Sequence, residues 1–117
     1  MNGIKCLLDT NIILGIVKGN VGAVSKLKGL DLKNCAFSSI TRMELLGFPG
    51  ITPHEVKIIS ALLKQMPQIS IDRAIEDKTI HLKQQHRIKL PDAIILATAT
   101  YHQIKLLTLD KKLANKL

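Results

Sequence analysis

Short apolar runs alternate with stretches of helical periodicity along this chain, and this alternation constrains the fold more than any other feature of the sequence. Four runs predict buried strands, over residues 4–8, 35–38, 68–71 and 104–108. Apolar residues recur at helical spacing between these runs. Strands that alternate with helices predict an α/β domain with a parallel central sheet and helices on both of its faces.

Each predicted helix has a start or stop signal in the sequence. Thr52, Pro53 and Glu55 have the pattern of a capping box with proline in the first turn, and Asp72 can cap the next helix. With 117 residues, the chain is predicted to form a single domain over residues 1–117. The predicted helices cover residues 12–18, 22–30, 39–46, 53–65, 73–86 and 91–101, and a short Lys-rich helix follows Asp110.

Four carboxylates, which we call the acidic quartet, lie at the edges of apolar runs: Asp9, Glu44, Asp92 and Asp110. A carboxylate beside a buried segment loses hydration, and a cation or hydrogen bonds must compensate for that loss. Each aspartate also has a structural explanation. Asp9 could cap a helix, Asp92 could complement a helix dipole, and Asp110 could form a turn. Glu44 interrupts a helix whose other positions favour burial. Because ligands of parallel sheets bind at the carboxyl ends of the strands, we expect the quartet to face one edge.

The acidic quartet offers only oxygen ligands, which suit Mg²⁺ or Mn²⁺ better than softer metals. Two divalent ions would balance the charge of the four groups. Metal ions held in this way activate water and stabilise the leaving oxygen in phosphodiester cleavage. The sequence has no Ser-His-Asp or Cys-His arrangement and no Gly-rich phosphate loop, either of which would favour another chemistry.

The rest of the chain is strongly basic. Its 17 Lys and Arg residues exceed its nine Asp and Glu residues, for a net charge of +8. Without the acidic quartet only five acids remain, so a basic body would surround an acidic site and attract a polyanion. Lysines that simply keep a small protein soluble are an equally good explanation of this charge.

Cys6 and Cys35 lie in predicted strands without the spacing of a metal or redox motif. We expect buried free thiols in a reducing compartment. The first residues lack the pattern of a signal peptide, and no run approaches the roughly 18 apolar residues of a membrane span. The sequence therefore predicts a cytoplasmic protein that makes no contact with a membrane.

Four segments resemble, in order, the successive motifs of the PIN-domain nucleases, particularly the VapC toxins of bacterial toxin–antitoxin modules. They run from Leu7 to Asn11, Ser39 to Gly47, Leu90 to Ala99 and Leu106 to Asp110, and together they span nearly the whole chain. The resemblance implies a PIN-like three-layer sandwich around a parallel sheet of four, or possibly five, strands. Many relatives continue past the last motif into another strand, whereas this sequence ends at Leu117, so a fifth strand and its dimer contact stay open.

By this resemblance, the acidic quartet would hold Mg²⁺ or Mn²⁺ and carry the catalysis. Asn11, Thr41 and Thr108 match polar positions of the same motifs and would support the quartet or the attacking water. The resemblance further implies a metal-dependent endoribonuclease that hydrolyses RNA phosphodiester bonds with metal-activated water. It also implies a cognate antitoxin as partner and a homodimer.

Three basic residues, Arg42, Arg87 and Lys89, stand close to these motifs in the sequence and are candidates for contact with RNA phosphates. The chain has only three aromatic residues, so we expect RNA binding to depend on charge rather than on base stacking.

Two alternatives to a toxin nuclease stay open. One is a phosphoryl-transfer or receiver domain in which Asp9 is phosphorylated, but Asp9 is followed by Thr10 and Asn11 rather than by the second aspartate of the phosphatase motif. The other is a PIN-like module outside a toxin system that binds or processes RNA. The intact acidic quartet argues against a module without catalysis.

Overall fold

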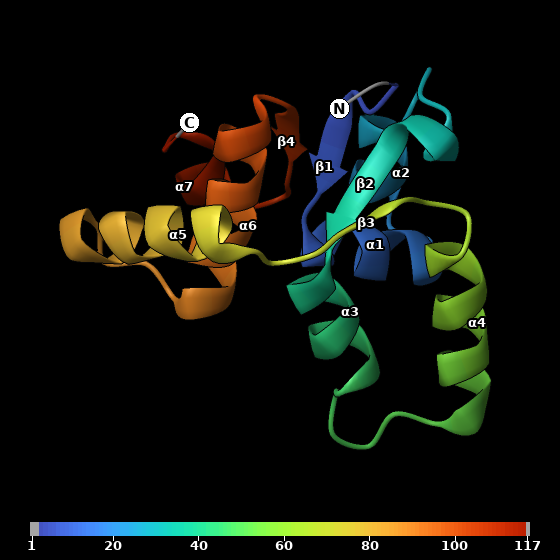
Figure 1. The fold of residues 1–117 in the computed structure, drawn as a ribbon. Coiled ribbons are helices and arrows are strands. Elements are labelled where there is room, and N and C mark those ends of the chain that lie inside the picture. The colour runs from blue at the N-terminus through green and yellow to red at the C-terminus, as the bar shows by residue number, and fades with distance from the viewer. Residues whose placement is uncertain (1–2, 117) are drawn as a thin grey trace.

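The sheet at the centre of the molecule has four parallel strands in the order β3-β2-β1-β4 (Figure 1). A computed structural model describes residues 3–116 of the chain. The strands are β1 (Cys6–Leu8), β2 (Cys35–Ser38), β3 (Gln68–Ile69) and β4 (Lys105–Leu107). The predicted parallel sheet is confirmed, although β1, β3 and β4 are shorter than predicted. Within residues 3–116 the sheet has no fifth strand.

Helices cover both faces of the sheet and complete a three-layer fold, as predicted (Figure 1). On one side lie α5 (Arg73–Gln85), α6 (Leu90–His102) and α7 (Lys111–Ala114), and on the other lie α1 (Thr10–Val17), α2 (Val21–Lys26) and α4 (Pro53–Leu63). α3 (Ser39–Leu46) follows directly on β2. None of the helices within residues 3–116 is long and apolar enough to cross a membrane.

Alternation along the strands divides the core into two clusters. Cys6 and Leu8 of β1 pack with α1 and α4, whereas Leu7 between them packs with α5 and α6. β2 repeats the pattern around Ala36, which belongs to the second cluster. Successive side chains of a strand point to opposite faces of the sheet. Because both faces are covered, consecutive apolar residues are all buried, as is typical of a parallel sheet.

Two helices begin at the caps that the sequence predicted. At α4 the Thr52 hydroxyl accepts a hydrogen bond from the backbone N–H of Glu55 (3.1 Å), and the Glu55 carboxylate accepts one from the backbone N–H of Thr52 (3.1 Å). The backbone N–H of Thr52 lowers the pKa of Glu55, and so does the Thr52 hydroxyl, which donates to the Glu55 Oε1 (2.9 Å). At α5 the Asp72 Oδ1 accepts a hydrogen bond from the backbone N–H of Ile75 (2.9 Å). Both caps satisfy N–H groups that the first turn would otherwise leave without partners.

The segment after α2 differs from the prediction. The helix ends at Lys26, and its predicted continuation to residue 30 is wrong. Gly29 has a φ of +82°, a left-handed conformation that glycine adopts without strain and that does not continue a helix. Ala23 packs inward from this short helix, whereas Val24 is 52% exposed.

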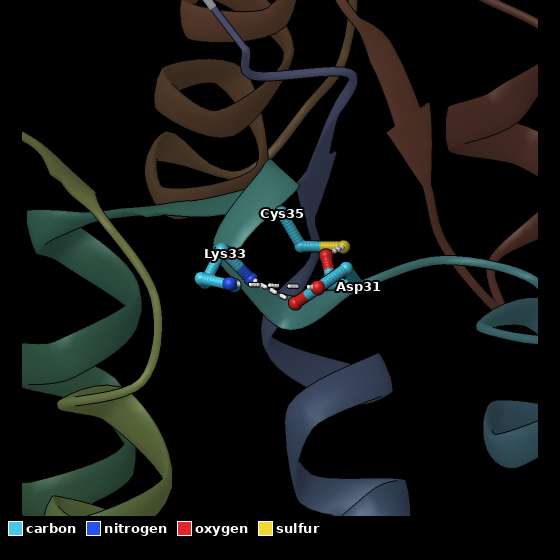
Figure 2. A network of polar contacts seen from close by, with 3 residues as sticks. All are labelled: Asp31, Lys33 and Cys35. Atoms are coloured by element: carbon cyan, nitrogen blue, oxygen red, sulfur yellow. Dashed lines mark hydrogen bonds and ion pairs between the residues drawn. The ribbon is translucent and has the colours of Figure 1, made fainter.

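Both cysteines are buried and free, as predicted. Cys6 and Cys35 are aligned on neighbouring strands, with 3.4 Å between their Sγ atoms. Burial, reinforced by the adjacent Cys35, raises the pKa of the Cys6 thiol to about 12. Figure 2 shows the turn that leads into β2, where Asp31 accepts hydrogen bonds from the backbone N–H of Lys33 (3.0 Å) and from the Cys35 Sγ (3.4 Å).

Candidate active site

Asp9 is the most buried member of the acidic quartet, with only 4% of its surface exposed. It directly follows β1, and its backbone N–H still donates to the Leu107 carbonyl of β4 (2.9 Å). It is also the N-cap of α1, because its Oδ1 accepts a hydrogen bond from the backbone N–H of Thr10 (2.7 Å). Its Oδ2 accepts a hydrogen bond from the Thr108 hydroxyl (2.6 Å). Each carboxylate oxygen therefore has one fixed donor and further lone pairs available.

Asn11 and Thr108 connect the end of β4 to the start of α1. The Asn11 Oδ1 accepts a hydrogen bond from the backbone N–H of Leu109 (3.1 Å), and its Nδ2 donates to the Thr108 Oγ1 (3.4 Å). Thr108 in turn accepts a hydrogen bond from the backbone N–H of Asp110 (3.0 Å) while it donates to Asp9. The two polar residues thus fix the relative positions of two quartet members from opposite ends of the chain.

Glu44 is held by a chain of two hydroxyl groups. The Thr10 Oγ1 donates to the Glu44 Oε1 (2.8 Å) and lies 2.9 Å from the Thr41 Oγ1. A hydroxyl has a single proton to donate. Because Thr10 gives its proton to Glu44, Thr41 must be the donor in the bond between the two threonines. Thr41 is fully buried, so the chain of hydrogen bonds starts in the core and ends at an exposed carboxylate.

Thr10 is the residue that sequence reasoning missed. It contacts two quartet members at once, through its backbone N–H to Asp9 and through its hydroxyl to Glu44. Its position between Asp9 and Asn11 is the signal that could have identified it. Three polar residues in succession stand here directly before a buried helix.

Asp92 and Asp110 differ in what binds their side chains. Asp92 lies in the first turn of α6, is half-buried, and accepts no hydrogen bond from any side chain or N–H group within residues 3–116. Asp110 is exposed and caps α7, because its Oδ1 accepts hydrogen bonds from the backbone N–H groups of Lys112 (2.9 Å) and Leu113 (3.3 Å). Asp110, for which the sequence offered a role as a turn former, is therefore a helix cap in the fold.

Electrostatic repulsion links the members of the acidic quartet. Burial is the main cause that raises the pKa of Asp9, and hydrogen bonds from Thr108 and Thr10 counteract it. Repulsion from Asp92 and then from Glu44 raises the pKa of Asp9 further. Asp9 therefore lies within electrostatic reach of two other carboxylates.

The pKa of Asp92 is raised as well. Burial is again the largest cause, repulsion from Asp110 adds to it, and Lys89 acts in the opposite direction. Asp9 is thus repelled by Glu44 and Asp92, and Asp92 is repelled by Asp110. The four side chains, which span the sequence from residue 9 to residue 110, share one region of the molecule.

The acidic quartet fits a hard divalent cation in its chemistry, since it offers only oxygen ligands and a cation would relieve its repulsion. Among residues 3–116, however, no group of three or more His, Cys, Asp and Glu side chains is close enough together to hold a metal ion. The expected burial of the other positions of this helix holds for Leu45 but is wrong for Met43, which is 52% exposed. Glu44 and the neighbouring Met43 are exposed because that side of α3 faces away from the core.

The comparison with protein families decides what kind of domain carries this arrangement. The model of the PIN domain matches residues 6–116, nearly the whole chain. The chain belongs to the PIN domain family. PIN domains are nucleases and generally use divalent metal ions. No curated protein matched the chain.

Solved structures of three other proteins share the fold. A chain of a toxin–antitoxin complex from Klebsiella pneumoniae is 34% identical, with a TM-score of 0.80 over 92% of this chain and 88% of that one. FitAcB from Neisseria gonorrhoeae is 23% identical, with a TM-score of 0.73 over 94% and 91% of the two chains. VapBC2 from Rickettsia felis, bound to a DNA fragment from its promoter, is 22% identical, with a TM-score of 0.72 over 96% and 92%.

Three members of the acidic quartet of this PIN domain line two separate clefts. The apolar cleft, of about 240 Å³, lies between α1, α3 and α4 and is lined by Thr10, Leu14, Lys18, Glu44, Leu45, Phe48, Ile51, Glu55 and Ile59. The basic cleft, of about 250 Å³, lies between the start of α6 and α7 and is lined by Arg87, Ile88, Lys89, Asp92, Asp110, Lys112, Leu113 and Lys116. Asp9 lines neither cleft, but its pKa is raised by Asp92 from the basic cleft and by Glu44 from the apolar cleft.

The PIN domain brings only two of the three predicted RNA-contact residues to the quartet. Arg87 and Lys89 line the basic cleft together with Asp92 and Asp110, whereas Arg42 is exposed on α3 and lines neither cleft. A larger hollow of about 640 Å³ lies over α2, but no carboxylate lines it. We assign the candidate active site to the region around Asp9, whose pKa is raised by a carboxylate from each cleft.

Proposed function

We propose that this PIN domain is a Mg²⁺- or Mn²⁺-dependent endoribonuclease and the toxin of a toxin–antitoxin module. The observation that carries the proposal is the mutual repulsion within the acidic quartet. The pKa values of Asp9 and Asp92 are both raised by burial and by neighbouring carboxylates. Such an arrangement destabilises the folded protein unless a cation is bound, and functional sites are where perturbed pKa values gather.

Each polar residue of the site has a role in this mechanism. The acidic quartet would hold the metal, and a bound Mg²⁺ or Mn²⁺ would supply a water of lowered pKa and positive charge beside the leaving oxygen. Thr10 and Thr108 orient the Asp9 carboxylate and favour its charged form by donating to both of its oxygens. Asn11 fixes Thr108, and Thr41 fixes Thr10, so the ligands are held by a supporting layer of hydrogen bonds.

The substrate proposed is RNA, bound through its phosphates. The net charge of +8 attracts a polyanion, and Arg87 and Lys89 stand beside the carboxylates that would act on it. Arg42, which is exposed on α3 and lines neither cleft, is left out of this proposed contact. The free thiols Cys6 and Cys35 support an assignment to the cytoplasm, because disulfides are rare in that compartment.

An antitoxin is the protein partner that we propose, because the solved structures similar to this chain come from toxin–antitoxin complexes. The apolar cleft supports this, since Phe48 is 66% exposed at its edge and exposed apolar patches mark contacts with other proteins. A homodimer is also part of the proposal, and it rests on the resemblance of the motifs to those of the VapC toxins. Expression should arrest growth, and the product of the adjacent reading frame should relieve the arrest; a protein that cuts RNA without arresting growth would be a processing nuclease instead.

Asparagine substitutions test the nuclease directly. Asp9→Asn and Asp92→Asn should each lower the rate of RNA cleavage by at least about 10³-fold, because several kcal/mol of transition-state stabilisation depend on the metal that they hold. Cleavage by the parent should require Mg²⁺ or Mn²⁺ and stop in chelator. Asp77→Asn, which removes the same charge from the exposed surface of α5, is the matched control and should cleave like the parent.

The acidic quartet is not the catalytic site if both variants cut a panel of structured RNAs as fast as the Asp77→Asn control. Circular dichroism of all three variants would show that any lost cleavage is not lost folding.

A further inference from the structure

The basic cleft places four cations beside two carboxylates without pairing them. Arg87, Lys89, Lys112 and Lys116 line the cleft with Asp92 and Asp110. Within residues 3–116, the ion pair between Lys33 and Asp31 is the single one present, and it lies elsewhere. The cleft therefore carries an excess of two positive charges, and none of its cations pairs with an acid among residues 3–116.

Each wall of the cleft contains one hydrogen bond from a lysine to a backbone carbonyl. The Lys83 Nζ donates to the Ile88 carbonyl (2.8 Å) and fixes the loop that carries Arg87 and Lys89. On the opposite wall, the Lys116 Nζ lies 3.5 Å from the Lys112 carbonyl, as expected for residues one helical turn apart. The buried Leu113 between them anchors this wall in the core. The two walls are thus independent elements that converge on one space.

The apolar cleft has no such excess of positive charge. Its charged residues are one cation, Lys18, and two acids, Glu44 and Glu55, and the rest of its lining is mainly apolar. A phosphate approaching Asp9 from this side would meet net negative charge. A phosphate approaching from the other side would meet an excess of cations.

We infer that the basic cleft is a binding subsite for a backbone phosphate of the RNA strand, next to the phosphate that is cut, with Lys112 and Lys116 as contact residues in addition to Arg87 and Lys89. The inference rests on the proposed nuclease function and adds the direction in which the strand leaves the acidic quartet, over α7 rather than over α3. No aromatic residue lines the cleft, so this subsite reads the backbone and not the bases. Its volume of about 250 Å³ also lies below that of typical small-molecule pockets.

The test removes the two new contacts and measures binding without catalysis. Binding of a fluorescent single-stranded RNA to the full chain is followed by anisotropy in chelator, at several salt concentrations. Lys112→Ala/Lys116→Ala should weaken binding and lower the slope of log affinity against log salt by about 1.4, from two lost contacts at about 0.7 each. Lys112→Arg/Lys116→Arg keeps both charges and should restore the parental slope.

The matched control is Lys26→Ala/Lys57→Ala, which removes two exposed lysines from α2 and α4. It should leave the salt slope of the parent unchanged. In cleavage assays, Lys112→Ala/Lys116→Ala should raise KM with kcat within about twofold, because the lost contacts bind substrate and transition state alike.

Equal losses in the two double-alanine variants would overturn the inference, since charge anywhere on the surface would then suffice. So would an unchanged slope and KM in Lys112→Ala/Lys116→Ala when the parent binds and cuts RNA. If no variant cuts RNA but the slope falls only for Lys112→Ala/Lys116→Ala, the subsite stands and the proposed nuclease function fails. The two proposals therefore fail separately.

Discussion

The two clefts around the acidic quartet are nearly equal in size and opposite in chemistry. The apolar cleft, about 240 Å³, brings Glu44 to a surface of Leu, Ile and Phe side chains. The basic cleft, about 250 Å³, brings Asp92 and Asp110 to a surface of Lys and Arg side chains. Asp9 belongs to neither lining, yet its pKa is raised by a carboxylate from each.

Clefts of such different chemistry beside one candidate active site are suited to different partners. Apolar surface favours a protein partner, because its burial supplies the energy of association. Cationic surface favours a nucleic acid, because phosphate contacts release counterions. A partner in the apolar cleft would reach Glu44 without occupying the basic cleft. The comparison predicts that substitutions in the two clefts will have different kinds of effect, on stability in one and on substrate binding in the other.

The largest expected effect in this comparison is on stability. Ile59→Ala at the floor of the apolar cleft should lower the free energy of unfolding by about 2–4 kcal/mol, because Ile59 is 4% exposed and its removal leaves a cavity in the first core cluster. Lys112→Ala in the basic cleft should change it by no more than about 0.5 kcal/mol. Urea unfolding of both variants measures this. Similar losses in the two would show that the basic cleft is also part of the core.

A smaller effect should follow from Thr10, which lines the apolar cleft but binds two quartet members. Thr10→Val removes the hydroxyl that donates to Glu44 and should lower Mn²⁺ affinity about 10–100-fold, the usual range for residues that orient metal ligands. Thr10→Ser keeps the hydroxyl and should restore the affinity measured by calorimetry.

Thr100→Val is the matched control for this substitution, because the Thr100 hydroxyl bonds only to its own helix, at the Leu96 carbonyl (2.7 Å). It should bind Mn²⁺ like the parent. If Thr10→Val and Thr10→Ser behave alike, the hydroxyl does not position Glu44, and the apolar cleft is less closely connected to the quartet than the hydrogen bonds suggest.

The smallest effect concerns pH in the metal-free protein. The pKa values of Asp9 and Asp92 in the folded state are raised above the ordinary aspartate value of 3.8, which applies to the unfolded state. The folded state therefore binds protons at these two groups more tightly than the unfolded state does. The resulting penalty is fully present at neutral pH and is relieved as the pH falls through the folded values toward 3.8. In chelator, the free energy of unfolding should therefore rise on mild acidification.

Asp92→Asn should remove its share of that penalty. At neutral pH in chelator it should melt about 2–4 °C above the parent, on the order of 0.5 kcal/mol after allowance for solvent screening of a half-buried group. The gain should shrink as the pH approaches 3.8. Asp77→Asn should not share it, and a parent that melts at the same temperature as Asp92→Asn at neutral pH would contradict the repulsion.

Much of the fold followed from local patterns. The parallel sheet, the helices on both faces and the caps at Thr52 and Asp72 were all predicted, because side-chain periodicity and capping depend on neighbours within a few residues. The end of α2 was not, since the left-handed Gly29 and the burial of Ala23 depend on how the helix meets the rest of the core. The family, too, could be recognised from four motifs in order.

For the candidate site, the order of residues alone showed which carboxylates stand at the ends of apolar segments and that their ligand chemistry suits a hard cation. Packing of the elements established that Asp9 is buried and Glu44 exposed, and that Thr10 connects them. Packing also brought Lys112 and Lys116 into one cleft with Arg87 and Lys89. Periodicity fixes which face of an element a side chain takes, whereas burial and clefts depend on which elements pack together. Segments far apart in sequence create both, and no local pattern contains their distances.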